Sequence, residues 1–239
     1  MSSTRVPRTL AWILAVVVAA SSCSVLGSDT EEAPVEAPTS AAVEEALVDS
    51  QFTRDGTFQS HLDVKGAKGM DMVLTLYPTK STPRTNEWYP KGLKYFSFTF
   101  QAYDLSQKLR DPFETKRLVY LKRMKVTSDT VTVDGGKTKH PYKLDVEAAK
   151  ATFDPEPVQT ARGMLITSPK GAFELRNQPI KWMSLDTRGV ILTFKATISV
   201  QAEAGGSKYL ERTITQQVPI RIFESDEETQ VAEIPINAN

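Results

Sequence analysis

The sequence is poor in cysteine and histidine, with Cys23 as the single cysteine and His61 and His140 as the only histidines among 239 residues. One cysteine cannot form an internal disulfide, so the hydrophobic core must hold the fold together. Two histidines leave little for general-base chemistry or an ordinary zinc site. The chain also lacks the GxSxG, HExxH, GxxxxGK[ST] and CxxC motifs of common hydrolases, metalloenzymes, nucleotide-binding proteins and redox proteins. We therefore expect neither an enzyme nor a bound metal or cofactor.

Lysine and arginine are missing from two stretches, 24–50 and 224–239, which carry seven and five acidic residues. The first stretch is rich in Ala, Ser, Thr, Pro and Val, and it cannot bury enough apolar surface to offset the entropy of ordering. We predict a flexible acidic tether at 23–50 and an acidic tail at 224–239. The body between them, 51–223, has 27 basic and 17 acidic residues, a formal net charge of +10.

Long amphipathic helical patterns are also missing, and apolar residues alternate with polar ones instead. The clearest alternation covers 190–203, and further examples occupy 70–76, 96–102, 118–133, 142–148 and 210–223. This period of two puts one face of each strand on a core and the other in water, which is typical of antiparallel sheets. We predict an all-β fold for 51–223: an antiparallel β-sandwich, Ig-like or related, or two stacked β-units.

Turn-forming residues indicate how the strands connect. Asp134-Gly135-Gly136 predicts a tight hairpin, because Asp-Gly supplies the positive φ angles of such turns. Gly205-Gly206 predicts a second hairpin. Pro219 places the end of the last strand at a sheet edge, because proline donates no ladder hydrogen bond. Residues 146–152 could form a short helix in place of a strand.

The body contains a possible boundary and a faint repeat. Two prolines within 154–157 resist both helix and ladder, so this segment is the best internal boundary. Gly69-Met70 precedes Trp88 at the spacing with which Gly163-Met164 precedes Trp182. A duplication would explain this match, and coincidence among short strands is the alternative.

The first residues have the order of a targeting signal. Arg5 and Arg8 precede an apolar run at 10–20 that is too short to span a bilayer, and the small residues Ser21 and Ser22 follow. This order is typical of a secretory signal peptide. We predict that 1–22 is the signal peptide and that the rest of the chain is exported.

The end of this segment, Ala20-Ser21-Ser22-Cys23, resembles the lipobox of bacterial lipoprotein precursors. The resemblance covers targeting alone. It implies that the Cys23 thiol receives a diacylglyceryl group, that the peptide is cut before Cys23, and that two or three acyl chains anchor the protein in a membrane. Ser24, where Asp would retain a lipoprotein at the inner membrane, favours the outer membrane by the same resemblance. Soluble secretion after cleavage near Ala20 is the alternative.

Basic residues gather in two segments of the body, 116–125 and 137–143. If these segments are neighbouring strands, their charges form one patch that attracts anionic partners. For an exported protein the available anions are lipid headgroups, lipopolysaccharide, acidic glycans and peptidoglycan, and nucleic acid is not an expected partner. A solvated face with no specific ligand is the alternative. The candidate contacts on the first segment are Lys116, Arg117, Lys122, Arg123 and Lys125.

The segment 77–91 is a long connection rich in prolines, aromatics and cations. Prolines lower the entropy of a loop, and Trp and Tyr offer flat faces to a sugar or a partner side chain. This composition suits a binding loop whose candidate contacts are Lys80, Arg84, Trp88 and Tyr89. Alternatively, the two aromatic residues fold back to cover the open end of the sandwich.

These features lead to one functional expectation and two alternatives. We expect an exported lipoprotein, anchored by lipid on Cys23, that acts as a non-enzymatic binding or assembly module of the bacterial cell envelope. A hydrolase of an envelope glycan would instead need two carboxylates within about 10 Å of each other in one cleft. A structural subunit of a surface or secretion assembly would show a long unpaired edge strand or a broad apolar patch.

Overall fold

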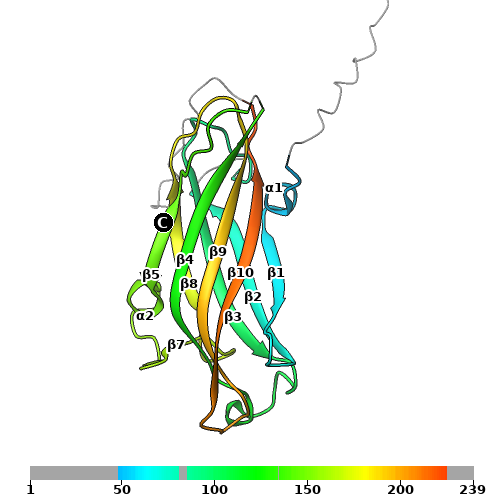
Figure 1. Cartoon of the computed structure of the whole chain (residues 1–239), viewed down its shortest axis with the longest axis vertical. Helices are drawn as coiled ribbons and strands as arrows, with labels where there is room; N and C mark the ends of the chain where they lie inside the picture. The colour runs from blue at the N-terminus through cyan, green and yellow to red at the C-terminus, as the bar shows by residue number, and fades with distance from the viewer. Residues whose placement is uncertain (1–47, 81–84, 134, 225–239) are drawn as a thin grey trace, which may run out of the picture. The chain divides into compact units, whose positions relative to one another are not determined.

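The computed structural model describes residues 48–80, 85–133 and 135–224, and most of them lie in two antiparallel sheets (Figure 1). The predicted antiparallel β-sandwich is confirmed. The four-stranded sheet has the order β1 (Phe58–Asp63), β2 (Met70–Thr79), β3 (Lys94–Asp104), β8 (Phe173–Ile180). The six-stranded sheet has the order β10 (Tyr209–Arg221), β9 (Thr187–Gln201), β4 (Val119–Thr132), β7 (Gly163–Leu165), β6 (Gln159–Thr160), and β5 (Lys143–Glu147) also pairs with β4.

The alternating sequence pattern places the core between the two sheets. In β9 the side chains from Val190 to Val200 are buried at every second position. The ring of Phe98 in β3 lies 5.1 Å from that of Phe194 in β9, measured between centroids, so the two sheets meet in edge-to-face aromatic contact. Burying each such side chain stabilises the fold by about 1.5–3 kcal/mol.

The short helix α1 (Gln51–Asp55) begins and ends with the residues its geometry requires. The Ser50 hydroxyl accepts a hydrogen bond from the Thr53 amide at 3.0 Å, and Gly56 ends the helix in a left-handed conformation with φ 68°. Phe52 is fully buried against Trp88. The Arg221 amide donates to the Thr53 hydroxyl at 3.3 Å, so α1 covers the end of β10.

The connection from β4 to β5 differs from the predicted tight hairpin at 134–136. β4 ends at Thr132 and β5 begins at Lys143. β5 pairs with Arg123–Thr127 in the middle of β4, so the chain must run back along β4 before it can pair. On the way, the Ser128 hydroxyl both accepts from the Tyr142 amide at 2.7 Å and donates to the Tyr142 carbonyl at 2.8 Å. Side-chain bonds replace ladder bonds here.

Strands from both sides of the possible boundary at 154–157 share both sheets. β8 pairs with β3 in one sheet, and β9 pairs with β4 in the other. The short helix that 146–152 could form is α2 (Ala148–Ala151), and a single 3-10 turn, η1 (Phe113–Thr115), precedes β4. The two tryptophans matched by the faint repeat have opposite environments, because Trp88 is 1% exposed and Trp182 is 56% exposed.

Candidate functional site

The predicted basic patch divides where β4 begins. Lys116, just before the strand, is 4% exposed, and its Nζ donates to the Lys108 carbonyl at 2.6 Å. Arg117 faces the interior as well, with its side chain 11% exposed. Lys122, Arg123 and Lys125 lie further along the strand and are exposed. A continuous basic run in the sequence therefore gives two different environments in the fold.

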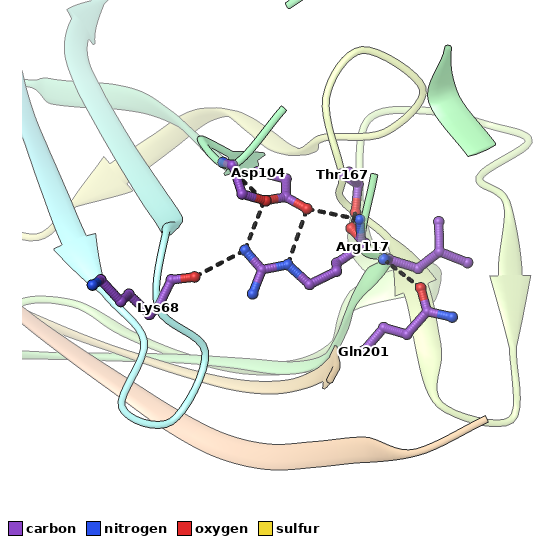
Figure 2. Close-up of polar contacts among 7 residues, drawn as sticks. Lys68, Asp104, Arg117, Thr167 and Gln201 are labelled. Atoms are coloured by element: carbon purple, nitrogen blue, oxygen red, sulfur yellow. Dashed lines mark hydrogen bonds and ion pairs between the residues drawn. The ribbon is translucent and has the colours of Figure 1, made fainter. Parts of the chain in front are cut away.

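Arg117 forms a two-pronged ion pair with Asp104, the last residue of β3 (Figure 2). Its Nε donates to Asp104 Oδ2 at 3.0 Å and its Nη2 to Oδ1 at 2.6 Å. The Arg117 amide donates to the same carboxylate at 2.9 Å, and the Ser106 hydroxyl donates at 2.6 Å. Nη2 also donates to the Lys68 carbonyl at 3.0 Å. The carboxylate is saturated with donors, as a buried charge requires.

This ion pair controls the ionisation of Asp104. Burial alone would raise the pKa of the Asp104 carboxyl, because the charged form loses water. The hydrogen bonds from Arg117 and Ser106 and the charge of Arg117 outweigh that effect and hold the pKa well below its usual range. The carboxylate therefore stays charged, and the pair links the end of β3 in one sheet to the start of β4 in the other.

Two further side chains fix the same end of the sandwich (Figure 2). The Leu118 amide donates to the Gln201 side-chain oxygen at 3.0 Å, and the Val119 amide donates to the Thr167 hydroxyl at 2.7 Å. Lys116 and Arg117 thus belong to a structural network. Both cations are bonded inside the fold and lie apart from the exposed basic residues of β4, so we do not include them in the surface considered below.

The outward side of β4 carries the remaining basic residues. The β4–β9 register shifts between Leu121 and Arg123, and Lys122 is the extra residue. Such a bulge explains why two consecutive residues, Lys122 and Arg123, are both exposed. Lys125 pairs directly opposite Lys195 of β9, and both side chains are exposed.

β5 adds one more cation and two acidic side chains to this surface. Lys143 of β5 pairs with Thr127, and the Thr130 amide bonds to the Lys139 carbonyl, so the segment 137–143 lies beside the part of β4 that follows 116–125. Arg123 Nε lies 2.6 Å from Asp145 Oδ1. The hydrogen bond from Arg123 and the nearby positive charges lower the pKa of Asp145 against the opposing effect of burial. We define the basic face as Lys122, Arg123, Lys125, Lys143 and Lys195, with Asp145 and Glu147 beside it.

The aromatic residues of the segment 77–91 fold back onto the sandwich. Trp88 is 1% exposed, its Nε1 donates to the Thr85 carbonyl at 3.1 Å, and its ring lies 5.0 Å from that of Phe52. Tyr89 is half-buried, with its ring 5.9 Å from that of Phe223. Trp88 therefore covers the end of the core, which is the alternative that the sequence left open for this residue.

Lys94, which the sequence analysis did not single out, binds the backbone of the same loop. Its side chain is among the largest fully buried ones, and Nζ donates to the carbonyls of Tyr89 at 2.8 Å, Pro90 at 3.1 Å and Gly92. Burial lowers the pKa of Lys94 to about 8. No carboxylate of the described residues takes part, so the loop carbonyls solvate this cation.

The remaining candidate residues are separated from one another. Lys80 is exposed, with Nζ 5.3 Å from the centroid of the Tyr95 ring. Arg84 and the lipidation candidate Cys23 lie outside the described residues. The exposed tryptophan near this loop is Trp182, which has Lys91 Nζ 5.8 Å from its ring centroid.

The two histidines lie on the surface beside carboxylates. His61 Nδ1 is 2.7 Å from Asp71 Oδ2, and His140 Nδ1 is 3.0 Å from Asp129 Oδ1. Their side chains are 64% and 68% exposed.

Within 48–80, 85–133 and 135–224, no three His, Cys, Asp or Glu side chains are grouped so that they could hold a metal ion. No helix in this described part is long and apolar enough to cross a membrane.

A cavity of about 380 Å³ opens near the start of β4, on the six-stranded sheet. Tyr120, Thr160, Ala161, Arg162 and Tyr209 line it. The sequence reasoning missed this site, because its residues come from β4, the β6–β7 turn and β10, which are far apart along the chain. Arginine beside two phenols is a set that binds anions, and no carboxylate is among the residues that line the cavity.

Comparison with models of known protein families gives no match, and comparison with curated proteins gives none either.

Proposed function

We propose that this chain is an exported, lipid-anchored binding module of the bacterial cell envelope, and that it acts without catalysis. The lipobox-like Ala20-Ser21-Ser22-Cys23 supports the anchor, and the acidic segment after it supports a tether. The basic face would hold an anionic component of the envelope or an acidic protein partner. The lipid keeps the body near such anions, and the tether lets it reach them.

One observation carries this proposal: like charges face each other across the outer surface of the six-stranded sheet. Lys125 and Lys195 are directly opposite in β4 and β9, and like charges in this arrangement destabilise a sheet. Neither side chain, nor that of Lys122, forms an ion pair within the described part of the chain. Lys125 also lies directly opposite Asp145 of β5, whose charge offsets part of this repulsion. A bound anion would relieve the remainder, which supports an anionic partner.

Binding of the purified chain to isolated bacterial envelopes tests the proposal. A Cys23→Ser chain removes the lipid, so sedimentation with envelopes reports the contribution of the body alone. We expect binding that weakens steeply as salt rises, because exposed charges are screened within about 10 Å at 0.1 M salt. Replacing Lys122, Lys125 and Lys195 together by Gln should weaken binding by about tenfold or more, which corresponds to about 1.4 kcal/mol.

A matched variant separates this face from net charge. Lys65, Lys68 and Lys181 are exposed and lie outside the basic face. Their joint replacement by Gln removes the same charge and should leave envelope binding within about twofold of the unmodified chain. Equal losses in both triple variants, or binding that salt does not affect, would overturn the proposal.

The assembly-subunit alternative depends on the edge of β10. The Ala202 amide bonds to the Lys208 carbonyl, and the Ile222 amide bonds to that of Arg188. Because the β9–β10 register is continuous, the backbone amides and carbonyls of the even-numbered residues of β10 point toward β9. The odd-numbered residues therefore point their amides and carbonyls to the open side, where another strand would have to pair.

Several features on that open side of β10 hinder pairing with another strand. Pro219 has no amide to donate, and the Arg221 amide is bonded to α1. The carbonyl of Glu211 accepts from the Arg212 side chain at 2.7 Å, and that of Gln217 accepts from the Gln216 side chain at 2.6 Å. Such devices are typical of edges that avoid strand addition. The edge of β10 thus favours a body that binds through its surface over one that polymerises.

A further inference from the structure

The cavity near the start of β4 brings two phenols and one guanidinium together. The Arg162 guanidinium lies 4.0 Å from the centroid of the Tyr209 ring, and the rings of Tyr120 and Tyr209 are 6.1 Å apart between centroids. Tyr120 is 7% exposed. Burial, together with the charge and hydrogen bonding of the Tyr209 hydroxyl, raises the pKa of Tyr120, while the charge of Arg162 opposes the rise. The three polar groups are therefore close enough to act on one ligand atom.

The fold holds this arrangement in place through a tight turn. Thr160 pairs with Gly163, so Ala161 and Arg162 form a two-residue turn between β6 and β7. Gly163 has φ 120°, and a side chain there would overlap the carbonyl of Leu121 in β4. Only glycine permits β7 to approach β4 so closely at this point. The turn thus presents Arg162 from a fixed position beside Tyr120.

The donors of Arg162 are unused within the described residues. Its side chain makes no ion pair and no hydrogen bond there; its contact is the stacking on Tyr209. A guanidinium stacked on an aromatic ring keeps the N–H groups at its edge available, and these form paired hydrogen bonds to an oxyanion. By contrast, the Nε and Nη2 groups of Arg117 already donate hydrogen bonds to Asp104.

We propose that Tyr120, Arg162 and Tyr209 form a binding site for the oxyanion, carboxylate or phosphate, of a small ligand. Arg162 supplies the charge, the tyrosine hydroxyls supply further donors, and the rings contact the carbon skeleton. A volume of about 380 Å³ is at the small end of the range for ligand pockets, so the ligand is of the size of a monosaccharide acid or a sugar phosphate. The inference goes beyond the proposed function, because it requires neither the lipid nor the basic face.

NMR titration of the isotopically labelled Cys23→Ser chain tests this site with three matched probes. Glucuronate carries a carboxylate, glucose 6-phosphate carries a phosphate, and glucose carries neither. We expect one or both anions to shift the Arg162 Nε and the Tyr120 and Tyr209 ring signals saturably at millimolar concentration, and glucose to leave them unchanged. The anion that shifts them more identifies the source of the oxyanion. Equal shifts with glucose, or no shift with either anion, would overturn the inference.

Substitutions distinguish a built site from general attraction of anions. Arg162→Gln should weaken binding of the better anion by about tenfold or more, since hydrogen bonds to charged groups contribute about 1.5–3 kcal/mol. Tyr209→Phe keeps the ring and should weaken binding less. Arg110→Gln removes one exposed charge elsewhere and should leave the affinity within about twofold. Equal losses from Arg162→Gln and Arg110→Gln would contradict the site.

The variant in which Lys122, Lys125 and Lys195 are replaced by Gln should still bind the anion. This control separates the result at the cavity from the outcome of the envelope experiment.

Discussion

The two ends of β3 hold buried cations in opposite ways. At its last residue, Asp104, a full negative charge neutralises Arg117. At its first residue, Lys94, the cation is surrounded by the carbonyls of Tyr89, Pro90 and Gly92, with no carboxylate among its bonded partners. Both cations fix a loop at an end of the sandwich. Loss of Arg117 leaves a buried carboxylate without its counter-charge, whereas loss of Lys94 leaves only carbonyl dipoles unpaired. We therefore predict destabilisation of different size on mutation, and pH dependence in two separate ranges, alkaline for Lys94 and acidic for Asp104.

The largest effect is expected from breaking the ion pair. Arg117→Met leaves the Asp104 carboxylate buried without its counter-charge, and loss of one partner of a buried pair costs about 3–5 kcal/mol. The measurement is the free energy of unfolding from urea denaturation at pH 7. Lys122→Met, on the exposed side of the same strand, should change it by less than about 0.5 kcal/mol. Similar losses in the two variants would show that the ion pair has no special role.

A smaller loss is expected at the other end of β3. Lys94→Met fills the same space but leaves three loop carbonyls without their donor, which we expect to cost about 2 kcal/mol. The decrease is smaller than for Arg117→Met because the variant leaves dipoles unpaired and no charge. Lys91→Met, beside the exposed Trp182, should cost about 0.5 kcal/mol or less. An Lys94→Met chain as stable as the unmodified one would contradict the solvating role of the carbonyls.

Alkaline pH should stabilise the Lys94 end. The amine loses its proton near pH 8 in the folded state and near pH 10.4 when unfolded, so folding releases a proton between these values. The free energy of unfolding of the unmodified chain, relative to Lys94→Met, should therefore rise by on the order of 1 kcal/mol between pH 7 and pH 9. A difference that stays constant with pH would show that Lys94 titrates as an exposed lysine does.

Acidic pH should weaken the opposite end. The Asp104 carboxyl has a folded pKa below its unfolded value of about 3.9, so its contribution is complete above that value and decreases as pH falls toward the folded pKa. The stability advantage of the unmodified chain over Asp104→Asn should shrink by on the order of 1 kcal/mol between pH 5 and pH 3. An advantage that does not change over this range would show that the folded and unfolded chains bind a proton at Asp104 equally, and would contradict a pKa lowered by folding.

The sequence predicts the fold where side-chain pattern alone decides it. β9 matches its predicted segment because its alternation is long and uninterrupted. β10 matches as well, although Arg212 and Gln216 interrupt its apolar face. β8 is not predictable in this way, because Asn177 has a positive φ of 52° and the β3–β8 register shifts between Phe96 and Phe98, which breaks the alternation. Long-range register, which the sequence pattern does not encode, also decides where β5 pairs.

The candidate site was harder to predict than the fold. Lys116, Arg117 and Lys122 look alike in the sequence, and only the partner Asp104, on another strand, turns Arg117 inward. Lys94 carries no sequence signal, since its partners are backbone carbonyls that every residue has. The exposure of Arg123 and Lys125 was predictable, because polar positions that alternate with buried ones must face water. The exposure of Lys122 was not, because it depends on the bulge in β4.

The N-terminus of the mature protein tests the central claim most directly. Intact-mass analysis of the chain purified from the membranes of the cells that produce it should give a protein that begins at Cys23 and carries a diacylglyceryl group and palmitate. A Cys23→Ser chain should lack this mass and leave the membrane fraction. A mature chain without lipid, or one that retains residues 1–22, would contradict the account of a tethered envelope module.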